Sequence, residues 1–439
     1  MSQKTIVSQA TPYGYSSIAV IRISGKKSMA IVKAITKTKN PLKDRAPTLL
    51  PVYDENNKKF DISLFTFFKN PRSYTGEDII EISCHGNPVI CRKIINRVVE
   101  EGGVLAKPGE YTKRAFLNGK MSLSEAESVG LLIASKSEEA LNINLKNIEG
   151  TTSRQIEKIK DSLLECLSGL EFEFDISEDE DTEKTISISI KSLKKLVLET
   201  RSLVLSFKKG VAFNHGVRVA IVGRPNVGKS TLMNKITQSN RSITSEIPGT
   251  TRDTVIKEII MSGVPITLVD TAGIRKNPGA IEGEGVKRTF SEITKSDLVI
   301  SLFSYNSEPV NNIELNKQIL VYNKSDIKKN TLNKNSVISI SALTGIGIEK
   351  LEKKLASKIK NLTSETGSQV LVTERQRQNI LACEGSIKKA LSRLQTDAPE
   401  LELVAFDIRA ALLALDSFLG RNITESVLNR VFSNFCVGK

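Results

Sequence analysis

Residues 223–231 read GRPNVGKST, and the apolar run VRVAIV precedes them at residues 217–222. This is the pattern GxxxxGKS, placed between a segment typical of a buried strand and a segment typical of a helix. Glycines let the backbone of such a loop curl, so that its N–H groups face bound phosphates. Lys229 can then reach the β and γ oxygens, and the Ser230 hydroxyl can ligate Mg²⁺. The stretch predicts an α/β domain that binds a nucleotide.

A second motif, DTAG at residues 270–273, follows the strand-like run PITLV. Asp270 is placed to hold Mg²⁺ through a water molecule, and the Gly273 N–H is placed to meet a γ-phosphate. The loop IPGTTRD, residues 247–253, lies between the two motifs. Thr251 of this loop can close on the metal when a triphosphate is bound. Because hydrolysis would remove that contact and release the loop, the arrangement predicts a switch.

The motifs NKSD, residues 323–326, and SAL, residues 341–343, also follow strand-like runs. Asp326 can accept two hydrogen bonds from the N1–H and the N2 amino group of guanine, and adenine lacks those donors. The Ala342 N–H can meet guanine O6. Four motifs in this order predict a guanine-nucleotide site. Its expected residues are Asn226, Val227, Gly228, Lys229, Ser230, Thr231, Ser245, Glu246, Ile247, Pro248, Gly249, Thr250, Thr251, Asp270, Thr271, Ala272, Gly273, Asn323, Lys324, Asp326, Ser341, Ala342 and Leu343.

The segments around these motifs predict a multidomain protein. Residues 214–362 alternate apolar strands with helices, which indicates a parallel sheet with helices on both sides. Residues 1–118 mix short β-like runs with turns and predict an α+β domain. Residues 119–213 and 363–439 have helical periodicity, and Ser122 and Glu125 form a candidate capping box at the start. The simplest architecture is an all-α helical domain with the α/β domain inserted between its two halves.

The amino-acid composition indicates which partners and which cellular compartment to expect. Lysine plus arginine exceeds aspartate plus glutamate by 63 − 49 = 14, which favours a polyanion partner such as RNA or reflects a lysine-rich proteome. The five cysteines form no CxxC pair, which argues against a disulfide framework or a zinc site and for a reducing compartment. No apolar run approaches the ~20 residues needed to span a bilayer, and the start lacks the apolar core of a signal peptide. We therefore expect a soluble cytoplasmic protein.

The residue after DTAG raises a question about hydrolysis. In well-known GTPases a glutamine at this position orients the attacking water. Here the residue is Ile274, whose side chain can neither donate nor accept a hydrogen bond. Another group must therefore position the water.

Several blocks resemble the tRNA uridine-modification GTPase family known as MnmE or TrmE, within the TrmE-Era-EngA-YihA-Septin-like superfamily. They are IVSQATPYGYSSIAVIRISG, SYTGEDIIEISCHG, KPGEYTKRAFLNGKMSLSEAES, the GTPase motifs and the terminal FCVGK, in the family order and over essentially the full length. The resemblance implies an N-terminal domain that binds tetrahydrofolate and dimerises, a helical domain, and an inserted Ras-like domain.

The resemblance implies that hydrolysis occurs when two nucleotide domains meet across K⁺, the cation taking the place of an arginine finger. Asn226 matches the family's K⁺-binding asparagine, and Ser245, Ile247 and Thr250 would supply further oxygens. Mg²⁺ would be held by Ser230 and Thr251. The water would be oriented by Glu282 of IRKNPGAIEGEG, with Glu284 as the local competitor.

The family's folate contacts carry over to Arg22, Glu81, Lys120 and Lys439. Folate has a pterin edge rich in donors and a tail that bears carboxylates, so one acid with several cations suits it. Tyr13 and Tyr15 stand where the family is richer in glycine. Cys436 matches the family's C-terminal cysteine, and a thiolate there can act as a nucleophile if a cation lowers its pKa, although a lone cysteine is more often a small apolar residue.

The function implied by the resemblance is a GTPase that modifies the wobble uridine of certain tRNAs at C5. A flavoprotein partner, MnmG or GidA, would carry FAD and use NADH. The carbon donor would be 5,10-methylene- or 5-formyl-tetrahydrofolate, with glycine or ammonium as the nitrogen source. Two alternatives remain open at this point. One is a ribosome-assembly GTPase, although its usual RNA-binding module is not evident after residue 365, and the other is a stand-alone folate-dependent transferase with a regulatory GTPase insert.

Overall fold

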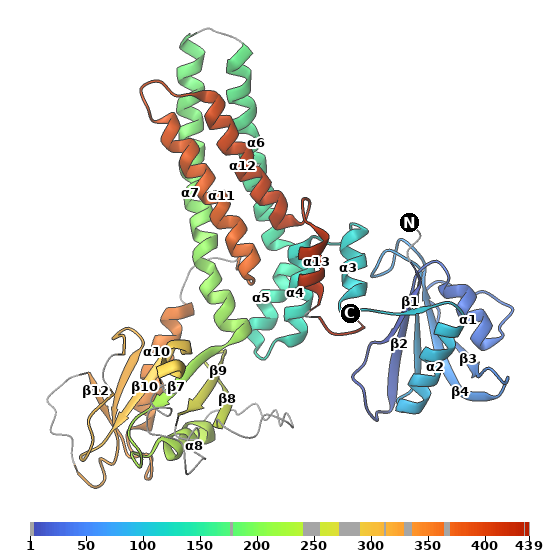
Figure 1. The fold of residues 1–439 in the computed structure, drawn as a ribbon, viewed down its shortest axis with the longest axis horizontal. Coiled ribbons are helices and arrows are strands. Elements are labelled where there is room, and N and C mark those ends of the chain that lie inside the picture. Colours follow the sequence, from blue (N-terminus) through green and yellow to red (C-terminus); the bar gives the residue numbers. More distant parts are fainter. Residues whose placement is uncertain are drawn as a thin grey trace. The chain divides into compact units, whose positions relative to one another are not determined.

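A computed structural model describes residues 4–175, 179–239, 255–271, 290–310, 313–328, 336–363, 369–433 and 435–438. The chain divides into two compact units, and Figure 1 shows their helices and strands coloured by residue number. Unit 1 comprises Met1–Gly130, Ile148–Asp161 and Arg409–Lys439, and unit 2 comprises Leu131–Asn147 and Ser162–Ile408. Each unit is therefore built from segments that lie far apart in the sequence.

Unit 1 contains a six-stranded sheet in the order β3-β4-β5-β2-β1-β6. Its strands are β1 (Ile6–Gln9), β2 (Ile18–Ser24), β3 (Thr48–Tyr53), β4 (Lys59–Phe68), β5 (Ile79–His85) and β6 (Val104–Leu105). All neighbours pair antiparallel except β1 and β6, which are parallel. The predicted α+β class of this region is confirmed.

Two helices, α1 (Ser28–Thr36) and α2 (Pro88–Glu100), pack on one face of this sheet (Figure 1). Residues in strands alternate between the two faces, so Ile21 and Ile23 of β2 point into the core with Ile80 and Ile82 of β5. The intervening residues of β2 and β5 occupy the opposite face, where Arg22 pairs with Glu81. The strand register therefore places two predicted folate residues side by side.

The rest of unit 1 is helical. It includes α3 (Glu110–Leu117), most of α4 (Leu123–Ala134) and α13 (Glu425–Phe432). Leu123 and Ala126 of α4 form an apolar cluster with α13, although some 300 residues separate the two helices in the chain. The predicted capping box is present, since the Glu125 N–H donates to Ser122 Oγ at 3.3 Å and the Ser122 N–H donates to Glu125 Oε2 at 3.0 Å.

Unit 2 contains the second six-stranded sheet, in the order β12-β11-β10-β7-β9-β8. Its strands are β7 (Val217–Val222), β8 (Val255–Met261), β9 (Val264–Asp270), β10 (Leu298–Phe303), β11 (Gln318–Tyr322) and β12 (Val337–Ser339). All pairs are parallel except β8 with β9. The parallel sheet predicted from the apolar runs is confirmed, and the carboxyl ends of its parallel strands meet at one edge.

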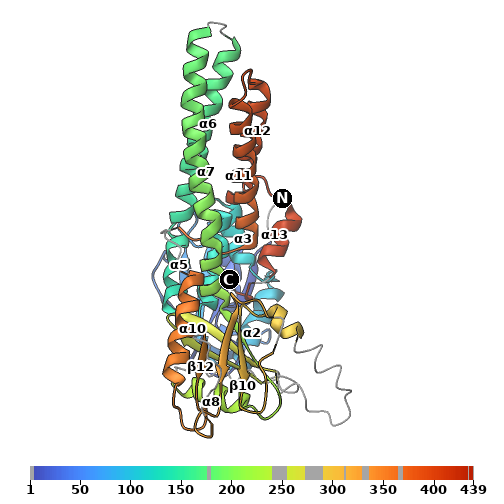
Figure 2. The ribbon, with the colours of Figure 1, turned by 90° about the vertical axis from the view of Figure 1, so that its left-hand side faces the viewer.

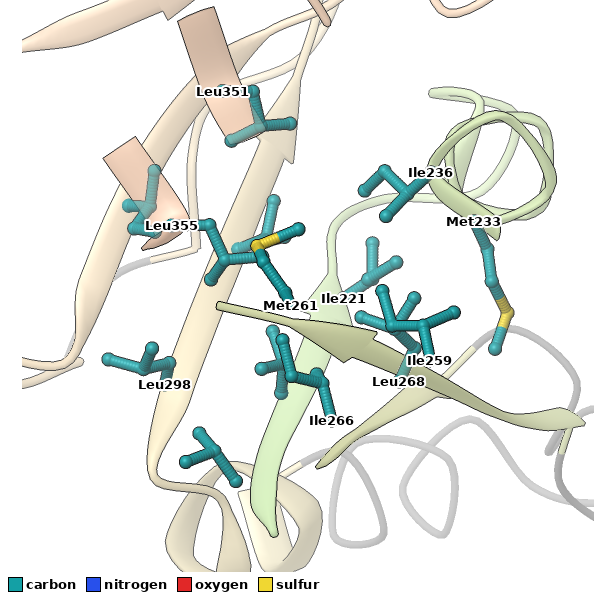
Figure 3. Packing of buried hydrophobic residues seen from close by; sticks show 14 of the residues in the cluster. Ile221, Met233, Ile236, Ile259, Met261, Ile266, Leu268, Leu298, Leu351 and Leu355 are labelled. Carbon is teal, nitrogen blue, oxygen red and sulfur yellow. The ribbon is translucent and has the colours of Figure 1, made fainter. Parts of the chain in front are cut away.

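Both faces of this sheet are covered. Helices α8 (Lys229–Ser239) and α10 (Ile348–Thr363) pack on one face, where Met233 and Leu351 lie over strand residues such as Ile221 (Figure 3). Val222 and Val299 point to the other face and pack near Ile293, within the helical residues 290–295. No helix forms in the described part of residues 304–318, where the sequence leaves little room for one.

The remaining helices lie almost entirely within residues 119–213 and 363–439, the two segments predicted to be helical. They are α5 (Glu138–Ile148), α6 (Thr151–Asp175), α7 (Asp179–His215), α11 (Glu374–Leu394) and α12 (Leu401–Leu419). Helix α11 packs along α7, so the two helical parts of the chain do associate (Figure 2). In the parts of the chain that the structure describes, no helix is long and apolar enough to cross a membrane.

Candidate functional site

The phosphate loop lies at the carboxyl edge of the second sheet, between β7 and α8. Asn226 and Gly228 have left-handed backbone angles, φ 62° and 96°, and such alternation turns successive N–H groups toward one side. A methyl group on Gly228 would lie 2.4 Å from Asn323 Nδ2, so only glycine fits there. The Lys229 ammonium donates to the carbonyls of Gly223 and Arg224, each at 2.9 Å. It therefore lies over the loop that would hold the phosphates.

Asn323 connects the phosphate loop to both base-recognition motifs. Its amide Nδ2 donates to the Val227 carbonyl at 2.7 Å, and its Oδ1 accepts from the Ala342 N–H at 2.9 Å. The side chain is 2% exposed, so both polar groups depend on these partners. The structure thus brings GRPNVGKST, NKSD and SAL together in one place. The Ala342 N–H, expected to meet guanine O6, here donates to Asn323.

Ser230 and Asp270 meet at the phosphate end of the site. The Ser230 hydroxyl donates to Asp270 Oδ2 at 2.6 Å, and Asp270 is 1% exposed. Thr271, the next residue, donates its hydroxyl to the Ile221 carbonyl at 3.0 Å, which fixes the end of β9 against β7. Two oxygen donors of the kind that Mg²⁺ prefers are therefore adjacent here.

The base end of the site is open. Asp326 is exposed, and within the described residues its carboxylate accepts no hydrogen bond. Lys324 has φ 64°, Ser341 is buried, and Leu343 is 78% exposed. The Ser325 N–H donates to the Ile340 carbonyl at 3.1 Å, which holds the NKSD loop next to the strand that precedes SAL. A carboxylate is therefore presented to solvent beside a buried amide network.

Several predicted residues lie outside the described residues. They are Ser245, Glu246, Ile247, Pro248, Gly249, Thr250, Thr251, Ala272, Gly273, Glu282 and Lys439. Ile274 and Glu284 also lie outside them. The roles expected of these residues in closing on the metal, binding K⁺ and orienting water stay predictions.

A second cluster in unit 1 contains the predicted folate residues. Arg22 donates through Nη2 and Nε to Glu81 Oε1 at 2.7 and 2.9 Å, and through Nη1 to the Gly438 carbonyl at 3.2 Å. The guanidinium also lies 5.9 Å from the ring centroid of Tyr74 and 5.6 Å from that of Tyr111. Burial raises the pKa of Tyr74, although its hydrogen bond with Thr112 and the charge of Arg22 oppose the shift. Tyr74 therefore remains neutral at physiological pH.

A cavity of about 420 Å³ opens beside this cluster. Glu81 and Lys120, two of the four predicted folate residues, line it together with Tyr74. Arg22 is not among the lining residues, and it contacts one of them, Glu81, through their ion pair. Tyr13 and Tyr15 are 76% and 86% exposed and are not among the lining residues.

The C-terminal tail packs into the same unit. Gly438 has φ 101°, and a methyl group there would lie 2.6 Å from the Gln9 carbonyl, which explains the glycine of FCVGK. The Cys436 side chain is exposed, while its backbone carbonyl accepts from the Gly109 N–H at 3.3 Å. The tail thus carries residue 438 to Arg22, across 416 positions of sequence.

Reasoning from the sequence missed part of both sites. It included Asn323 but not the bridge that Asn323 makes, because two loops must be placed in space before the bridge can be seen. It also missed Arg45, Arg72 and Tyr74, which line the cavity. The signal for Tyr74 was available, since it stands within the quoted block SYTGEDIIEISCHG.

A phosphate loop between β7 and α8, with base-recognition loops after β11 and β12, defines a P-loop guanine-nucleotide-binding protein. The family model "MnmE helical domain" matches residues 123–436, and the model "GTP-binding protein TrmE N-terminus" matches residues 5–120. The chain belongs to the family of tRNA modification GTPases called MnmE.

Proteins of this family are similar in sequence to the whole length of this chain. The tRNA modification GTPase MnmE of Fervidobacterium nodosum is 38% identical over 455 residues, covering 100% of this chain and 98% of the relative. Those of Thermotoga petrophila and Aquifex aeolicus are 36% and 34% identical, with 99% and 100% of this chain covered and 100% of each relative. Among solved structures, the G domain of the T. maritima FeoB iron transporter matches 32% of this chain and 98% of that chain, at 25% identity and a TM-score of 0.25.

Proposed function

We propose that this chain hydrolyses GTP and acts in the modification of the wobble uridine of tRNA at C5. The full-length similarity to proteins named tRNA modification GTPase MnmE supports the role in tRNA. One observation supports the nucleotide site above all. Asn323 donates to the Val227 carbonyl and accepts from the Ala342 N–H, which joins the phosphate and base motifs into one site. The proposed partner is the flavoprotein MnmG, which supplies FAD and NADH chemistry. Wobble-uridine analysis of tRNA from cells that lack this chain tests the role.

Guanine selectivity is proposed to rest on Asp326. Its exposed carboxylate suits the two donors on the guanine edge, the N1–H and the N2 amino group. Xanthine carries an oxygen in place of that amino group, and an amide can donate to it. We therefore expect Asp326→Asn to weaken GTP binding at least ~100-fold while strengthening binding of the xanthine nucleotide. An unchanged preference for GTP would refute this assignment.

The phosphate end fits Mg²⁺. The Ser230 hydroxyl and the Asp270 carboxylate lie 2.6 Å apart and are both oxygen donors. Ser230 would hold the ion directly, Asp270 through water, and Thr251 is proposed as a further ligand. When bound, Mg²⁺ would neutralise charge on the β and γ phosphate oxygens. Lys229, which now donates to two carbonyls of its own loop, would transfer these bonds to phosphate oxygens.

Hydrolysis is proposed to require a homodimer of nucleotide domains. Ile274 cannot orient water, so Glu282 is proposed for that role and K⁺ for the charge that an arginine finger supplies elsewhere. Asn226 supports this proposal, because it is an exposed residue of the phosphate loop. Ser245, Ile247 and Thr250 would complete the K⁺ site.

The test is GTP turnover in KCl and in NaCl across protein concentrations. We expect the rate per molecule in KCl to rise with protein concentration and to exceed the rate in NaCl at least ~10-fold. Asn226→Ala should remove most of the K⁺ effect, whereas Asn316→Ala, at an exposed position of the same domain, should leave it unchanged. Equal rates in the two salts would overturn the proposal.

Unit 1 is proposed to bind a reduced folate, 5,10-methylene- or 5-formyl-tetrahydrofolate. Glu81 can accept hydrogen bonds from the pterin edge, and Arg22, which donates to Glu81 Oε1 at 2.7 Å, fixes the position of this side chain. Lys120 lines the same cavity, and Lys439, the residue after Gly438, is proposed as a fourth contact. Titration calorimetry with 5-formyl-tetrahydrofolate tests the site, and no heat at millimolar ligand would refute it.

Cys436 is proposed as a nucleophile of the modification reaction. Its exposed thiol is accessible, as reaction with a substrate requires. The expected result is loss of tRNA modification in Cys436→Ser with GTP hydrolysis unchanged. Full modification by this variant, assayed together with the flavoprotein partner, would remove Cys436 from the site.

A further inference from the structure

The cavity beside Glu81 is larger than the recognition of a pterin edge requires. Its volume of about 420 Å³ is in the range of sites that enclose a whole small ligand. Besides Glu81 and Tyr74 it is lined by Phe68 and by three cationic residues, Arg45, Arg72 and Lys120. Three cations and one acid line a single cavity.

The strand register places the acid and the cations at different ends. Glu81 of β5 is paired with Thr66 of β4, and Ile79 is paired with Phe68. Two residues along a strand span about 7 Å. Phe68 ends β4, and the Arg45 guanidinium lies 5.5 Å from its ring centroid. Arg45 therefore lies beside Phe68, away from Glu81.

Arg72 belongs to the loop that follows β4, and Arg45 and Lys120 both contact this loop. Arg45 Nη2 donates to the Arg72 carbonyl at 2.5 Å, and Lys120 Nζ donates to the Pro71 carbonyl at 3.0 Å. Consecutive residues are about 3.8 Å apart between Cα atoms, so both side chains reach the same turn of backbone. A ligand that extends from Glu81 past Phe68 would meet all three cations.

The charges at this end are only partly compensated. Arg72 pairs with Asp44 at 3.0 Å, whereas Arg45 and Lys120 donate to neutral carbonyls. Within the described residues, neither Arg45 nor Lys120 has a carboxylate partner. Two positive charges therefore remain available, and carboxylates are the natural ligands of such groups.

The loop that carries these groups is held in place. Asp78 Oδ1 accepts from the Asn70 backbone N–H at 2.9 Å and from its side-chain amide at 2.8 Å. Asp44 Oδ1 accepts from the Lys69 N–H at 2.9 Å. Because the carbonyls that orient Arg45 and Lys120 belong to a braced loop, less ordering is needed when a ligand binds.

We propose that the cationic end of this cavity binds the glutamate tail of folate and selects folates with more than one glutamate. The inference rests on the proposed folate site, and it adds the substrate class to it. A folate with one glutamate has two carboxylates, and each further glutamate adds one. The extra carboxylates would meet Arg45, which has no carboxylate partner among the described residues, and Arg72, whose ion pair with Asp44 is exposed to solvent on the Arg72 side.

The experiment compares two ligands on the full chain by titration calorimetry. They are 5-formyl-tetrahydrofolate with one glutamate and the same compound with three. We expect the triglutamate to bind the wild-type chain roughly 3- to 20-fold more tightly at low salt, because exposed ion pairs are individually weak. Raising the salt concentration should reduce this ratio.

Variants that remove positive charges test which residues cause the preference for the triglutamate. Arg45→Gln and Arg72→Gln together should bring the triglutamate preference close to one, while binding of the monoglutamate changes little. Lys93→Gln is the matched control, because the Lys93 ammonium also lies over a phenyl ring of β4, 5.3 Å from the Phe60 centroid, and does not line the cavity. It should retain the wild-type preference.

Each outcome decides a different point. If both ligands bind the wild-type chain equally well, the tail proposal is wrong and the folate site stands. If the preference persists in the double variant, the tail binds elsewhere and the inference is overturned. If neither folate binds, the folate proposal itself fails, and the inference fails with it.

Discussion

The Asn323 side chain connects three loops of the nucleotide site. Its two polar groups are buried, and each has one partner, the Val227 carbonyl and the Ala342 N–H. A buried group without a partner costs about 1–3 kcal/mol. One side chain therefore stabilises three loops that come from distant parts of the chain.

We predict that Asn323→Ala weakens binding of fluorescent GDP at least ~10-fold and lowers the unfolding free energy by about 1–3 kcal/mol. The reason is that two buried backbone groups lose their partners together. Asn316→Ala, at an exposed position in the same unit, should change neither quantity. Unaltered affinity in Asn323→Ala would show that the loops keep their places without the bridge.

The stability of unit 1 should depend on pH because of Tyr111. Its side chain is fully buried, and its hydroxyl donates to the Arg22 carbonyl at 2.6 Å. Burial raises the pKa of Tyr111 above its ordinary value of 10.0, with smaller opposing effects from Ser8 and Arg22. The folded state thus holds this proton more tightly than the unfolded state does, so stability is present below pH 10 and is lost as the pH rises above it.

The corresponding prediction concerns alkaline unfolding. The free energy of unfolding of unit 1 should fall between pH 9.5 and 11.5, and Tyr111→Phe should make this fall shallower because one ionisable group is removed. The variant is also expected to be less stable at neutral pH, since a buried hydrogen bond is lost. Urea unfolding at a series of pH values measures both. An equally steep fall in Tyr111→Phe would assign the effect to other groups.

At the scale of residues, local patterns were predicted well and contacts across the sheet were not. The Ser122 and Glu125 capping box could be predicted because both partners stand three positions apart. The ion pair between Arg22 and Glu81 could not, since it depends on the register of β2 against β5. A shift of β2 by one residue would have turned Arg22 to the other face of the sheet, away from Glu81.

At the scale of elements, glycines in helices show where chains approach closely. Gly210 lies within α7, and a methyl group there would lie 2.0 Å from the Leu371 carbonyl oxygen. The same segment donates the Leu371 N–H to Ser206 Oγ at 3.1 Å and accepts from Asn147 at the Val370 carbonyl. The chain that returns from α10 to α11 therefore crosses α7 at this glycine.

Two glycine substitutions should consequently have opposite effects. Gly385 lies exposed in α11 with open space around the position of a side chain, so Gly385→Ala should stabilise the chain by about 0.5–1 kcal/mol. Gly210→Ala gains the same helix propensity but must push backbone aside, and we expect a net loss of stability. Chemical denaturation measures both. Stabilisation by Gly210→Ala would mean that the crossing chain moves away at little cost.

The elements themselves were largely predictable. Apolar runs of strand length correspond to β7, β9, β10, β11 and β12, because buried parallel strands need nearly continuous apolar residues. The full length of α7, 37 residues, was not foreseen, because its periodicity begins inside a run of acids. Helical periodicity also could not show which helices pack together.

At the scale of the whole molecule, each unit has its own apolar core. The core of unit 1 lies between its sheet and helices α1 and α2, and the core of unit 2 lies under α8 and α10. The proposed folate and nucleotide sites belong to different units. A ligand that binds one folded unit should stabilise that unit by mass action.

Calorimetry should therefore show two unfolding transitions with separate ligand responses. At about 100 times its dissociation constant, a ligand adds ~2.7 kcal/mol, which corresponds to a rise of roughly 5–10 °C for units of this size. GDP with Mg²⁺ should raise one transition and 5-formyl-tetrahydrofolate the other. One transition that responds to both ligands would contradict the separation.

The sequence was sufficient to predict an inserted α/β domain and the family, because motifs and periodicity are local properties. It could not reveal that unit 1 takes in residues 148–161 and 409–439. Those segments are joined by pairs such as Lys160 with Asp416, at 2.6 Å and 256 positions apart. Such contacts follow from the folded chain and leave no periodic trace in the sequence.

Helix α7 runs without a break from Asp179 to His215, and Gly216 alone separates it from β7. Gly216 has φ 80°, and a methyl group there would lie 2.6 Å from the Pro265 carbonyl, so the junction with the sheet is tight. At ~1.5 Å per residue the helix is about 55 Å long. A rotation of the sheet by about 5° would therefore swing the remote end of the helix by roughly 5 Å. Because of this length, a small change in the orientation of the sheet produces a much larger displacement at the far end of the helix.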